Sequence, residues 1–510
     1  MFRFRFQVLG FGLWQQTVRE QALVLDQIII SEPGVDVTVR EDSWWNRLVA
    51  TWIGFINSFT TNFSMISEGL EGEDYITVWI GGITGGRDQA MALNSMVMRD
   101  FTSVYGIPVN LQLVGTGVVL VATLAGRGPD ITLSVATGEP VDFALRNAVM
   151  NLRRFDDFED VAGAFCHETR EFTGGRFFPG TIMPFQFYRE DGTGIPGVYA
   201  LPETVDWPMM FYRIDVLQEE GVNPSVDLLT WQSIRELYPS LLASNMEFGM
   251  PSTIGMFLSI LYQMGGELYR EGLVAVNFDD PLTLEAYRYF AAFFLELGIP
   301  RDFDFVNRFR TGEMPIAIAG YGQFNMISIF APELRGRWNM VPIPGTEVPC
   351  PSGTLNPDGS PVMIINNAVA PGAVAGAIMM AQTELPYESW QFLKWWTDAD
   401  AQFNFGRTLE AVMGAAARHP TANVEAFMRL PWPAEIRQNL LAQASQMRGV
   451  PEAPGGYYVG RHFGFATNDV LNDNVHDRQD ARQRLLRATI HINNEITRRR
   501  EEFGLSLDPR

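Results

Sequence analysis

Residues 75–86 read Tyr-Ile-Thr-Val-Trp-Ile-Gly-Gly-Ile-Thr-Gly-Gly, and they begin the pattern that decides the fold. The apolar and β-branched run at 76–80 predicts a buried strand, and the glycines predict its turn. Helical spacing over 87–105 leads to a second strand at 108–114, and Gly128-Pro129-Asp130 precedes a third at 131–134. Alternating strands and helices predict a parallel α/β sheet that binds ligands at the carboxyl ends of its strands.

The length and charge of the chain narrow the classes of protein it can belong to. Its 510 residues suggest two to four packed units. Lys and Arg number 38 against 59 Asp and Glu, which leaves a formal net charge of −21. Because such a field repels phosphate backbones and anionic lipid headgroups, we expect no nucleic-acid partner and no polybasic docking on membranes. No apolar run approaches the ~20 residues that span a bilayer.

Several residue types are too scarce for common catalytic sites. Lys394 is the single lysine, so a P-loop and a Ser-x-x-Lys acylase motif are both absent. Cys166 and Cys350 are the two cysteines, which could form one disulfide or be two free core residues; we favour the second. The five histidines lie far apart in sequence. We therefore expect neither a metal nor a cofactor.

Two motif-based alternatives receive little support. The turn at 81–86 reads Gly-Gly-x-x-Gly-Gly, which is not the Gly-x-Gly-x-x-Gly spacing of a dinucleotide site. A glycosidase needs two carboxylates at a set separation, and nothing in the sequence places a pair. The candidates for such a pair are Glu139, Glu203, Asp206, Glu313 and Glu410.

The rest of the chain is divided by changes in pattern. Residues 1–74 combine a strand-like run at 23–30 with a helix-period stripe that includes Trp45, Leu48 and Trp52, and we expect this segment to pack on a neighbour. A short strand is predicted at 198–203. A mainly helical region follows at 213–341 and closes with a strand at 315–320. A Pro/Gly-rich stretch at 342–376 comes next, and helices are predicted from there to the end.

Aromatic residues carry the positive signal for a ligand. Several of them stand at predicted strand ends or in Gly-rich loops and not on helical stripes, where a flat ring beside polar groups suits a sugar. These residues are Tyr199, Trp207, Tyr212, Tyr321, Tyr457 and Tyr458. By contrast, Trp390, Trp395, Trp396 and Trp432 lie in helical or Pro-flanked contexts and are predicted to be structural.

Four stretches together resemble family 1 extracellular solute-binding proteins, the ligand receptors of ABC sugar importers. Gly128-Pro129-Asp130 with 139–146 looks like the first lobe of that family, and 199–203 with 210–213 looks like its first crossover. Residues 307–318 resemble a helix-to-strand step in the second lobe, and 392–397 resemble its W-x-F-L-K-W helix. The resemblance covers residues from about 75 to about 505.

This resemblance implies an α/β fold of the type II periplasmic-binding-protein class, with two lobes joined by crossover hinges. By analogy, lobe 1 would comprise about 75–205 and 342–412, and lobe 2 about 206–341 and 413–510. Residues 1–74 resemble the end of an upstream region found in long members of the family. The start at Met1 would then be an internal or truncated one, which would explain why no secretion signal is visible in a protein expected outside the cytoplasm.

The resemblance also suggests which residues bind the ligand. Maltose-binding members place an acidic ligand residue four positions after the crossover proline, which is Asp206 here, with Trp207 beside it. Their Gly-Pro-Trp motif reads Gly320-Tyr321-Gly322, and two further maltose-type positions are Ser134 and Thr137. We expect Asp206 to accept sugar hydroxyls and Trp207 or Tyr321 to stack on the sugar. The full expected set is Asp206, Trp207, Tyr321, Gln323, Glu139, Thr137, Ser134, Arg87, Asp88, Glu203, Tyr457, Tyr458 and Arg461.

Taken together, these features predict a monomeric substrate-binding component that closes on a sugar or oligosaccharide and docks on ABC permease subunits, and that is not an enzyme. Tyr457, Tyr458 and Arg461 would form a lid that starts from Pro454-Gly455-Gly456. A glycoside-active enzyme and a carbohydrate sensor or adhesin on the same fold remain the alternatives.

Overall fold

The computed structural model describes most of the chain from Asp74 onward. The described residues are 43–45, 48–49, 51–53, 55, 66–67, 74–81, 86–188, 194–356, 358, 360–472 and 478–507. The strand expected at 23–30 and most of the glycine turn at 81–86 lie outside these residues. Of the expected N-terminal helix, the described residues 44–45, 48–49, 51–53 and 55 are helical.

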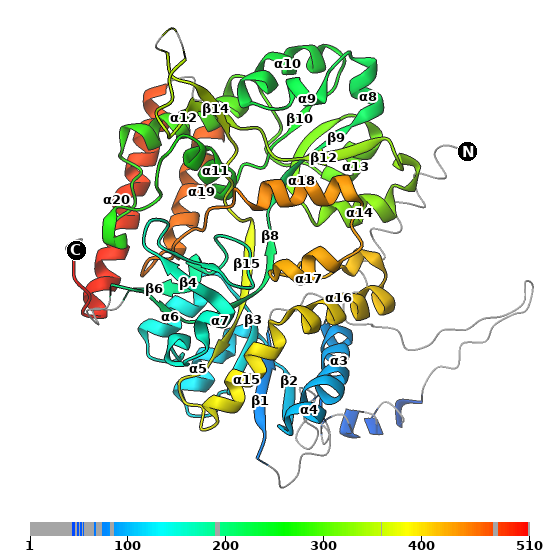
Figure 1. Ribbon diagram of the computed structural model, residues 1–510, viewed down its shortest axis with the longest axis vertical. Coiled ribbons are helices and arrows are strands. Elements are labelled where there is room, and N and C mark those ends of the chain that lie inside the picture. Colours follow the sequence, from blue (N-terminus) through cyan, green and yellow to red (C-terminus); the bar gives the residue numbers. More distant parts are fainter. Residues whose placement is uncertain are drawn as a thin grey trace, which may run out of the picture.

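A five-stranded sheet with the order β2-β1-β3-β15-β8 forms the lower half of the molecule in Figure 1. Strand β1 runs parallel to β2 and to β3, which confirms the parallel arrangement predicted for these three segments. The strands are β1 (Ile76–Ile80), β2 (Val109–Leu113), β3 (Ile131–Ala136), β8 (Leu201–Asp206) and β15 (Ala373–Met379). The strand predicted at 198–203 is thus displaced toward Asp206, with the short β7 (Gly197–Val198) before it.

Strand β15 was not predicted, and it runs antiparallel to both of its neighbours, β3 and β8. The sequence of β15 is Ala-Val-Ala-Gly-Ala-Ile-Met, which has few β-branched residues and no polar alternation. Gly376 is required in it because an added Cβ would lie 2.9 Å from the Phe185 ring and 3.0 Å from Ala200. Close packing in a fully covered sheet, and not local propensity, therefore makes this segment a strand.

A four-stranded sheet with the order β10-β11-β9-β12 lies in the upper half of Figure 1. Strand β9 is antiparallel to β11 and to β12, whereas β10 is parallel to β11. The strands are β9 (Pro208–Arg213), β10 (Phe248–Gly249), β11 (Ile316–Gly320) and β12 (Trp338–Val341). The two-stranded pairs are β4 (Gly163–Cys166) with β5 (Glu171–Gly174), β6 (Gln186–Phe187) with β7, and β13 (Thr346–Pro349) with β14 (Met363–Asn366).

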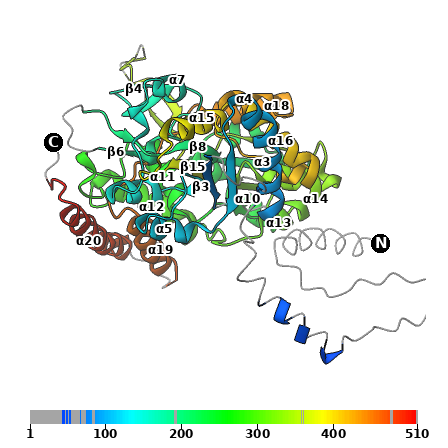
Figure 2. The ribbon, with the colours of Figure 1, turned by 90° about the horizontal axis from the view of Figure 1, so that it is seen from below.

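Helices cover both sheets. The helices around the five-stranded sheet are α3 (Gly86–Met96), α4 (Ser103–Tyr105), α5 (Val119–Leu124), α6 (Glu139–Leu145), α7 (Phe158–Ala162), α15 (Pro386–Trp396) and α16 (Ala399–Met413). Those around the four-stranded sheet are α8 (Ile214–Glu219), α9 (Pro224–Asp227), α10 (Trp231–Ala243), α11 (Ile254–Gln263), α12 (Pro281–Leu295), α13 (Phe305–Thr311) and α14 (Gln323–Phe330). The chain ends with α17 (Val424–Arg429), α18 (Ala434–Ala444), α19 (Tyr457–Asn472) and α20 (Arg478–Glu502). Figure 2 shows α19 and α20 side by side along one flank.

Several helix starts follow directly from the sequence. Thr230, Asp280 and Asp398 each accept a hydrogen bond from a backbone N–H in the first turn of α10, α12 and α16. Such caps satisfy donors that have no partner inside the helix. Helix α15, which contains Trp390, stops at Trp396, and Asp398 caps the start of α16.

The two cysteines are free, as favoured, but neither is a core residue. Cys166 and Cys350 are both partly exposed, at the end of β4 and after β13. Their placement in hairpins accounts for the difference, because the core of each half is built from the larger sheets and their helices.

One buried carboxyl ties the five-stranded sheet to α15. Glu203 is 2% exposed, and its two oxygens accept hydrogen bonds from the Ser134 backbone N–H and from the Trp396 indole. Burial raises the pKa of Glu203 to about 7, and the two donors act in the opposite direction. Trp396, which was predicted to be structural, therefore contributes a hydrogen bond to the buried Glu203 carboxyl.

Replacing Trp396 by Phe removes one donor from this buried carboxyl. We expect the Trp396→Phe substitution to lower the free energy of unfolding by ~1–3 kcal/mol, the cost of leaving a buried polar group without its partner. Urea denaturation followed by circular dichroism measures it. Trp395→Phe is the matched control, because the Trp395 ring packs on Phe101 and Phe392 instead. Equal losses in the two variants would contradict a role for the hydrogen bond.

Candidate ligand site at the crossover between the two sheets

Asp206 and Trp207 connect the two large sheets. Asp206 is the last residue of β8, Pro208 is the first of β9, and Trp207 alone lies between them. Two other segments meet this crossover: the Gly372 N–H donates to the Asp206 carbonyl (2.8 Å), and the Val205 N–H donates to the Pro420 carbonyl (2.9 Å). Three stretches far apart in sequence therefore pass side by side from one half of the molecule to the other.

The Asp206 carboxylate reaches across to the four-stranded sheet. Its Oδ1 accepts a hydrogen bond from the Gly322 N–H at 3.4 Å. An added Cβ on Gly320 would lie 1.9 Å from Asp206 Oδ2, so only glycine permits this approach. Loss of hydration raises the pKa of Asp206 to about 6, although backbone N–H groups favour its charged form. Asp206 is thus a partly exposed acceptor held between the two sheets.

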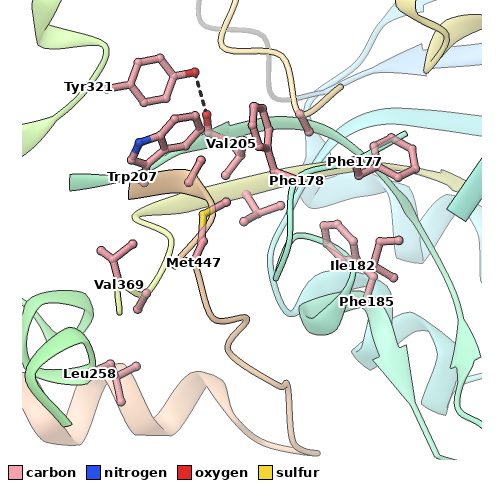
Figure 3. Packing of buried hydrophobic residues seen from close by; sticks show 14 of the residues in the cluster. Phe177, Phe178, Ile182, Phe185, Val205, Trp207, Leu258, Tyr321, Val369 and Met447 are labelled. Atoms are coloured by element: carbon pink, nitrogen blue, oxygen red, sulfur yellow. Dashed lines mark hydrogen bonds between the residues drawn. The ribbon is translucent and has the colours of Figure 1, made fainter. Parts of the chain in front are cut away.

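Trp207 and Tyr321 are brought together, but not as open platforms. Their ring centroids are 4.3 Å apart, and the Tyr321 hydroxyl donates to the Val205 carbonyl at 3.0 Å, as Figure 3 shows. Trp207 is 0% and Tyr321 2% exposed, and Phe178 packs against Trp207 from the side of the first sheet. In this structure both rings pack on protein. Stacking of either ring on a sugar stays a prediction.

A third crossover segment completes this cluster, and the sequence analysis missed its role. The Arg418 guanidinium lies 4.6 Å from the centroid of the Trp432 ring and donates to Glu410 at 2.6 Å. Trp432 contacts Tyr321 with 6.1 Å between ring centroids. Trp432 was predicted to be structural, and it is 7% exposed. No motif marks Arg418, although its contacts Glu410 and Trp432 lie only 8 and 14 residues away along the chain.

Glu203 has a structural role that the sequence did not indicate. It lies three residues before Asp206 on β8 and is almost fully buried, with both oxygens bonded to protein donors. A contact of Glu203 with a ligand stays a prediction.

The other predicted residues of the first half occupy two places. Ser134, with a φ of 57°, and Thr137, whose hydroxyl donates to the Val374 carbonyl at 2.8 Å, lie at the carboxyl end of β3. Arg87 and Asp88 are exposed in the first turn of α3. Gln323 begins α14, directly after the Gly322 N–H that donates to Asp206. A contact of any of these residues with a ligand stays a prediction.

The two halves also meet at the start of α6. An added Cβ on Gly138 would lie 3.4 Å from the carboxyl carbon of Glu452, which precedes α19. Burial raises the pKa of Glu452 to about 8, and the nearby Asp142 adds to the shift. Burial and Asp142 also raise the pKa of Glu139. Glu452 was not predicted, since one acid in a Pro-flanked loop carries no sequence signal.

The predicted lid residues are part of a helix. Tyr457, Tyr458 and Arg461 lie in the first two turns of α19. The Tyr457 hydroxyl donates to Glu495 Oε1 on α20 at 3.3 Å and accepts from Arg499 at the same distance. Closure by these residues over a ligand stays a prediction.

Among the described residues, no group of three or more His, Cys, Asp or Glu side chains is placed to hold a metal ion. The crossover offers the Asp206 carboxylate as a hydrogen-bond acceptor, positioned by the Gly322 N–H and bordered by buried aromatic rings. Such an arrangement can bind a polar, uncharged ligand by hydrogen bonds without reacting with it.

The sequence profile of bacterial extracellular solute-binding proteins matches residues 98–412. This chain belongs to that family. The matched region includes the whole crossover from β8 to β9, the Gly320–Gly322 turn and β15. No curated protein sequence matches the chain.

Several solved structures with the same fold carry a bound sugar or are named as sugar-binding proteins. The sugar-binding protein MalE from Xanthomonas citri is 17% identical, with a TM-score of 0.63, and covers 85% of this solute-binding protein and 100% of its own chain. The solute-binding protein of Staphylococcus aureus in complex with maltose is 14% identical (TM-score 0.60; 85% and 99% covered). That of Thermotoga lettingae bound to α-D-tagatose is 17% identical (TM-score 0.58; 83% and 100% covered). These likenesses show the fold expected for the family.

The contact between Glu452 and α6 makes stability depend on pH. The folded pKa of Glu452, about 8, lies above its ordinary value of 4.5, so its contribution to stability is complete below about pH 4.5 and is lost as pH rises through about 8. We expect the wild-type melting temperature to fall from pH 6 to about pH 8.5, and Glu452→Gln to reduce that fall. Glu347→Gln, at an exposed position of β13, is the control. Parallel melting curves for all three proteins would contradict the assignment.

Proposed function

We propose that this solute-binding protein captures a sugar or oligosaccharide between its two halves by hinge closure and delivers it to the permease subunits of an ABC importer. The observation that carries the proposal is the Asp206 crossover, where three segments join the sheets and one carboxylate faces both of them. The relatives bound to maltose and tagatose support a sugar as the class of ligand.

Hinge closure follows from how the halves are connected. Short crossovers allow the two sheets to rotate about a narrow zone while each keeps its own core. A ligand that contacts both halves favours the closed state and shifts the equilibrium toward it. Asp206 would take part in this step directly, because its backbone belongs to β8 and its side chain contacts the turn after β11.

The surroundings of the buried acids argue for binding and against hydrolysis. A glycosidase needs two carboxyl groups that flank the scissile bond. Glu203, one of the five candidate acids, accepts hydrogen bonds from Ser134 and Trp396 with its two oxygens. We therefore propose that the ligand leaves the protein chemically unchanged. We also propose that the protein acts as a monomer outside the cytoplasm and binds no nucleic acid.

A thermal-shift screen against a panel of mono- and oligosaccharides tests the proposed ligand class. A true ligand present at a hundred times its dissociation constant should add ~2.7 kcal/mol to the free energy of unfolding. Chromatography of the recovered sugar checks that it is intact. A panel without any hit, or a hit that is cleaved, would overturn the proposal.

Substituting Asp206 tests its role in binding. Loss of a charged hydrogen-bond partner in a dry site costs ~1.5–3 kcal/mol, so Asp206→Ala should weaken sugar binding by roughly ten- to a hundredfold. Calorimetric titration with the sugar found in the screen measures the dissociation constant. Asp302→Ala, at an exposed position far along the chain, should bind as the wild type does. Unchanged affinity in Asp206→Ala would remove Asp206 from the site.

The raised pKa of Asp206 adds a pH dependence to binding. Below about pH 6 the carboxyl is increasingly protonated and becomes a weaker acceptor of hydroxyl donors. Affinity for the sugar should therefore rise between about pH 5 and about pH 7.5 in the wild type. In Asp206→Asn the affinity should be weaker and nearly constant over that interval. The same titration at several pH values distinguishes this from a general effect of pH on the fold.

A further inference from the structure

A tryptophan-rich helical segment before the first sheet displays its apolar side chains to solvent. Exposed fractions are 71% for Trp44, 57% for Trp45 and 59% for Trp52. The Trp-rich face, as we define it, consists of Trp44, Trp45, Leu48, Val49, Trp52, Ile53 and Phe55, all of which are classed as exposed. Exposed apolar surface of this size on one helix marks an interaction site more often than chance composition.

The face is one side of a strongly amphipathic helix. At about 100° per residue, its seven positions fall within one half of a helical wheel. Thr51 falls in the other half. A half-circumference stripe with bulky indole rings is too wide for the narrow seam by which two helices pair in a coiled coil. The pattern instead fits a helix that lies on a flat apolar layer.

Charge distinguishes this segment from the rest of the protein. Between Asp42 and Glu68 the sequence has no acidic residue, and Arg47 is its one basic residue, although the whole chain carries a net charge of −21. An anionic lipid surface would therefore repel most of the molecule but not this segment. Trp and Phe prefer the boundary between headgroups and acyl chains, where a ring is partly dry.

The segment is tethered to the five-stranded sheet at its edge strand. Further along the chain, the Ile66 N–H donates to the Leu111 carbonyl at 2.9 Å, and the Leu111 N–H donates to the Ser67 hydroxyl at 2.7 Å. Residues 66–67 are thus held at the edge strand β2, at the opposite end of the sheet from β8, which ends at Asp206. None of the described helices combines the length and the apolar character needed to cross a bilayer.

We propose that the Trp-rich face binds the surface of a phospholipid bilayer, where it lies in the interface and holds the solute-binding domain beside the membrane. The physical basis is the burial of indole and aliphatic side chains at the headgroup boundary, with the opposite half of the helix turned to water. The role is separate from ligand capture, which uses the crossover between the sheets.

Flotation of the full chain with lipid vesicles tests the proposal. Vesicles of phosphatidylcholine and equimolar phosphatidylcholine–phosphatidylglycerol should both carry the wild-type protein upward in a density gradient. The double substitution Trp45→Ser with Trp52→Ser should reduce the bound fraction about tenfold or more, because each ring contributes buried apolar area. The matched control, Val104→Ser with Tyr387→Ser, removes two other exposed apolar side chains and should float as the wild type does.

Three readouts keep the result interpretable. Melting temperature and sugar affinity should be unchanged in the double Trp variant, since neither ring belongs to the core or the crossover. If that variant no longer floats with vesicles but still binds sugar, the result concerns the membrane role alone. Equal flotation of the two variants and the wild type would overturn the proposal. So would a lipid-free dimer in sedimentation velocity that the Trp substitutions dissociate, because the face would then bind a second copy.

Discussion

The hydrogen bonds around Asp206 are the constraint on which the rest of this protein depends. The Gly372 N–H holds the Asp206 carbonyl, the adjacent Val205 N–H binds the Pro420 carbonyl, and the carboxylate reaches the Gly322 N–H of the other sheet. Each bond joins the crossover to a different chain segment, so together the bonds hold the segments around Asp206, Gly372 and Pro420 side by side. The relative position of the two sheets, and with it any ligand site between them, follows from this junction.

Aromatic packing keeps the junction dry and thereby sets its electrostatics. Trp207, Tyr321 and Trp432 form a continuous wall, and Arg418 stacks on its outer ring. Removal of water from nearby carboxyls raises the pKa of Asp206 and, deeper in the first sheet, that of Glu203. A carboxyl that titrates near neutrality is a sensitive acceptor, because its environment decides how strongly it binds a hydroxyl. The same aromatic wall that packs against protein removes water from the Asp206 carboxyl and so raises its pKa.

Residue patterns predicted those elements whose buried faces are built from local sequence. The apolar run of β1 and the first three parallel strands follow from hydrophobic period and side-chain chemistry. The pattern failed for β15, where alanine and glycine are selected by the closeness of Phe185 and Ala200. It failed again for Glu203, since its partners Ser134 and Trp396 lie about 70 and 190 residues away along the chain.

The sequence by itself determined the class of protein: an acidic two-sheet α/β chain with scarce lysine and cysteine, and an acid four residues after Pro202 at the crossover. It also carried the amphipathic period of the Trp-rich face, because a helical wheel needs only residue order. The tertiary structure alone decided which aromatic rings are buried, that Glu203 serves the fold, and that Arg418 and Glu452 stand where the halves meet. The reason is physical: burial and pKa depend on neighbours brought together through space, and no local pattern encodes which distant segments those neighbours come from.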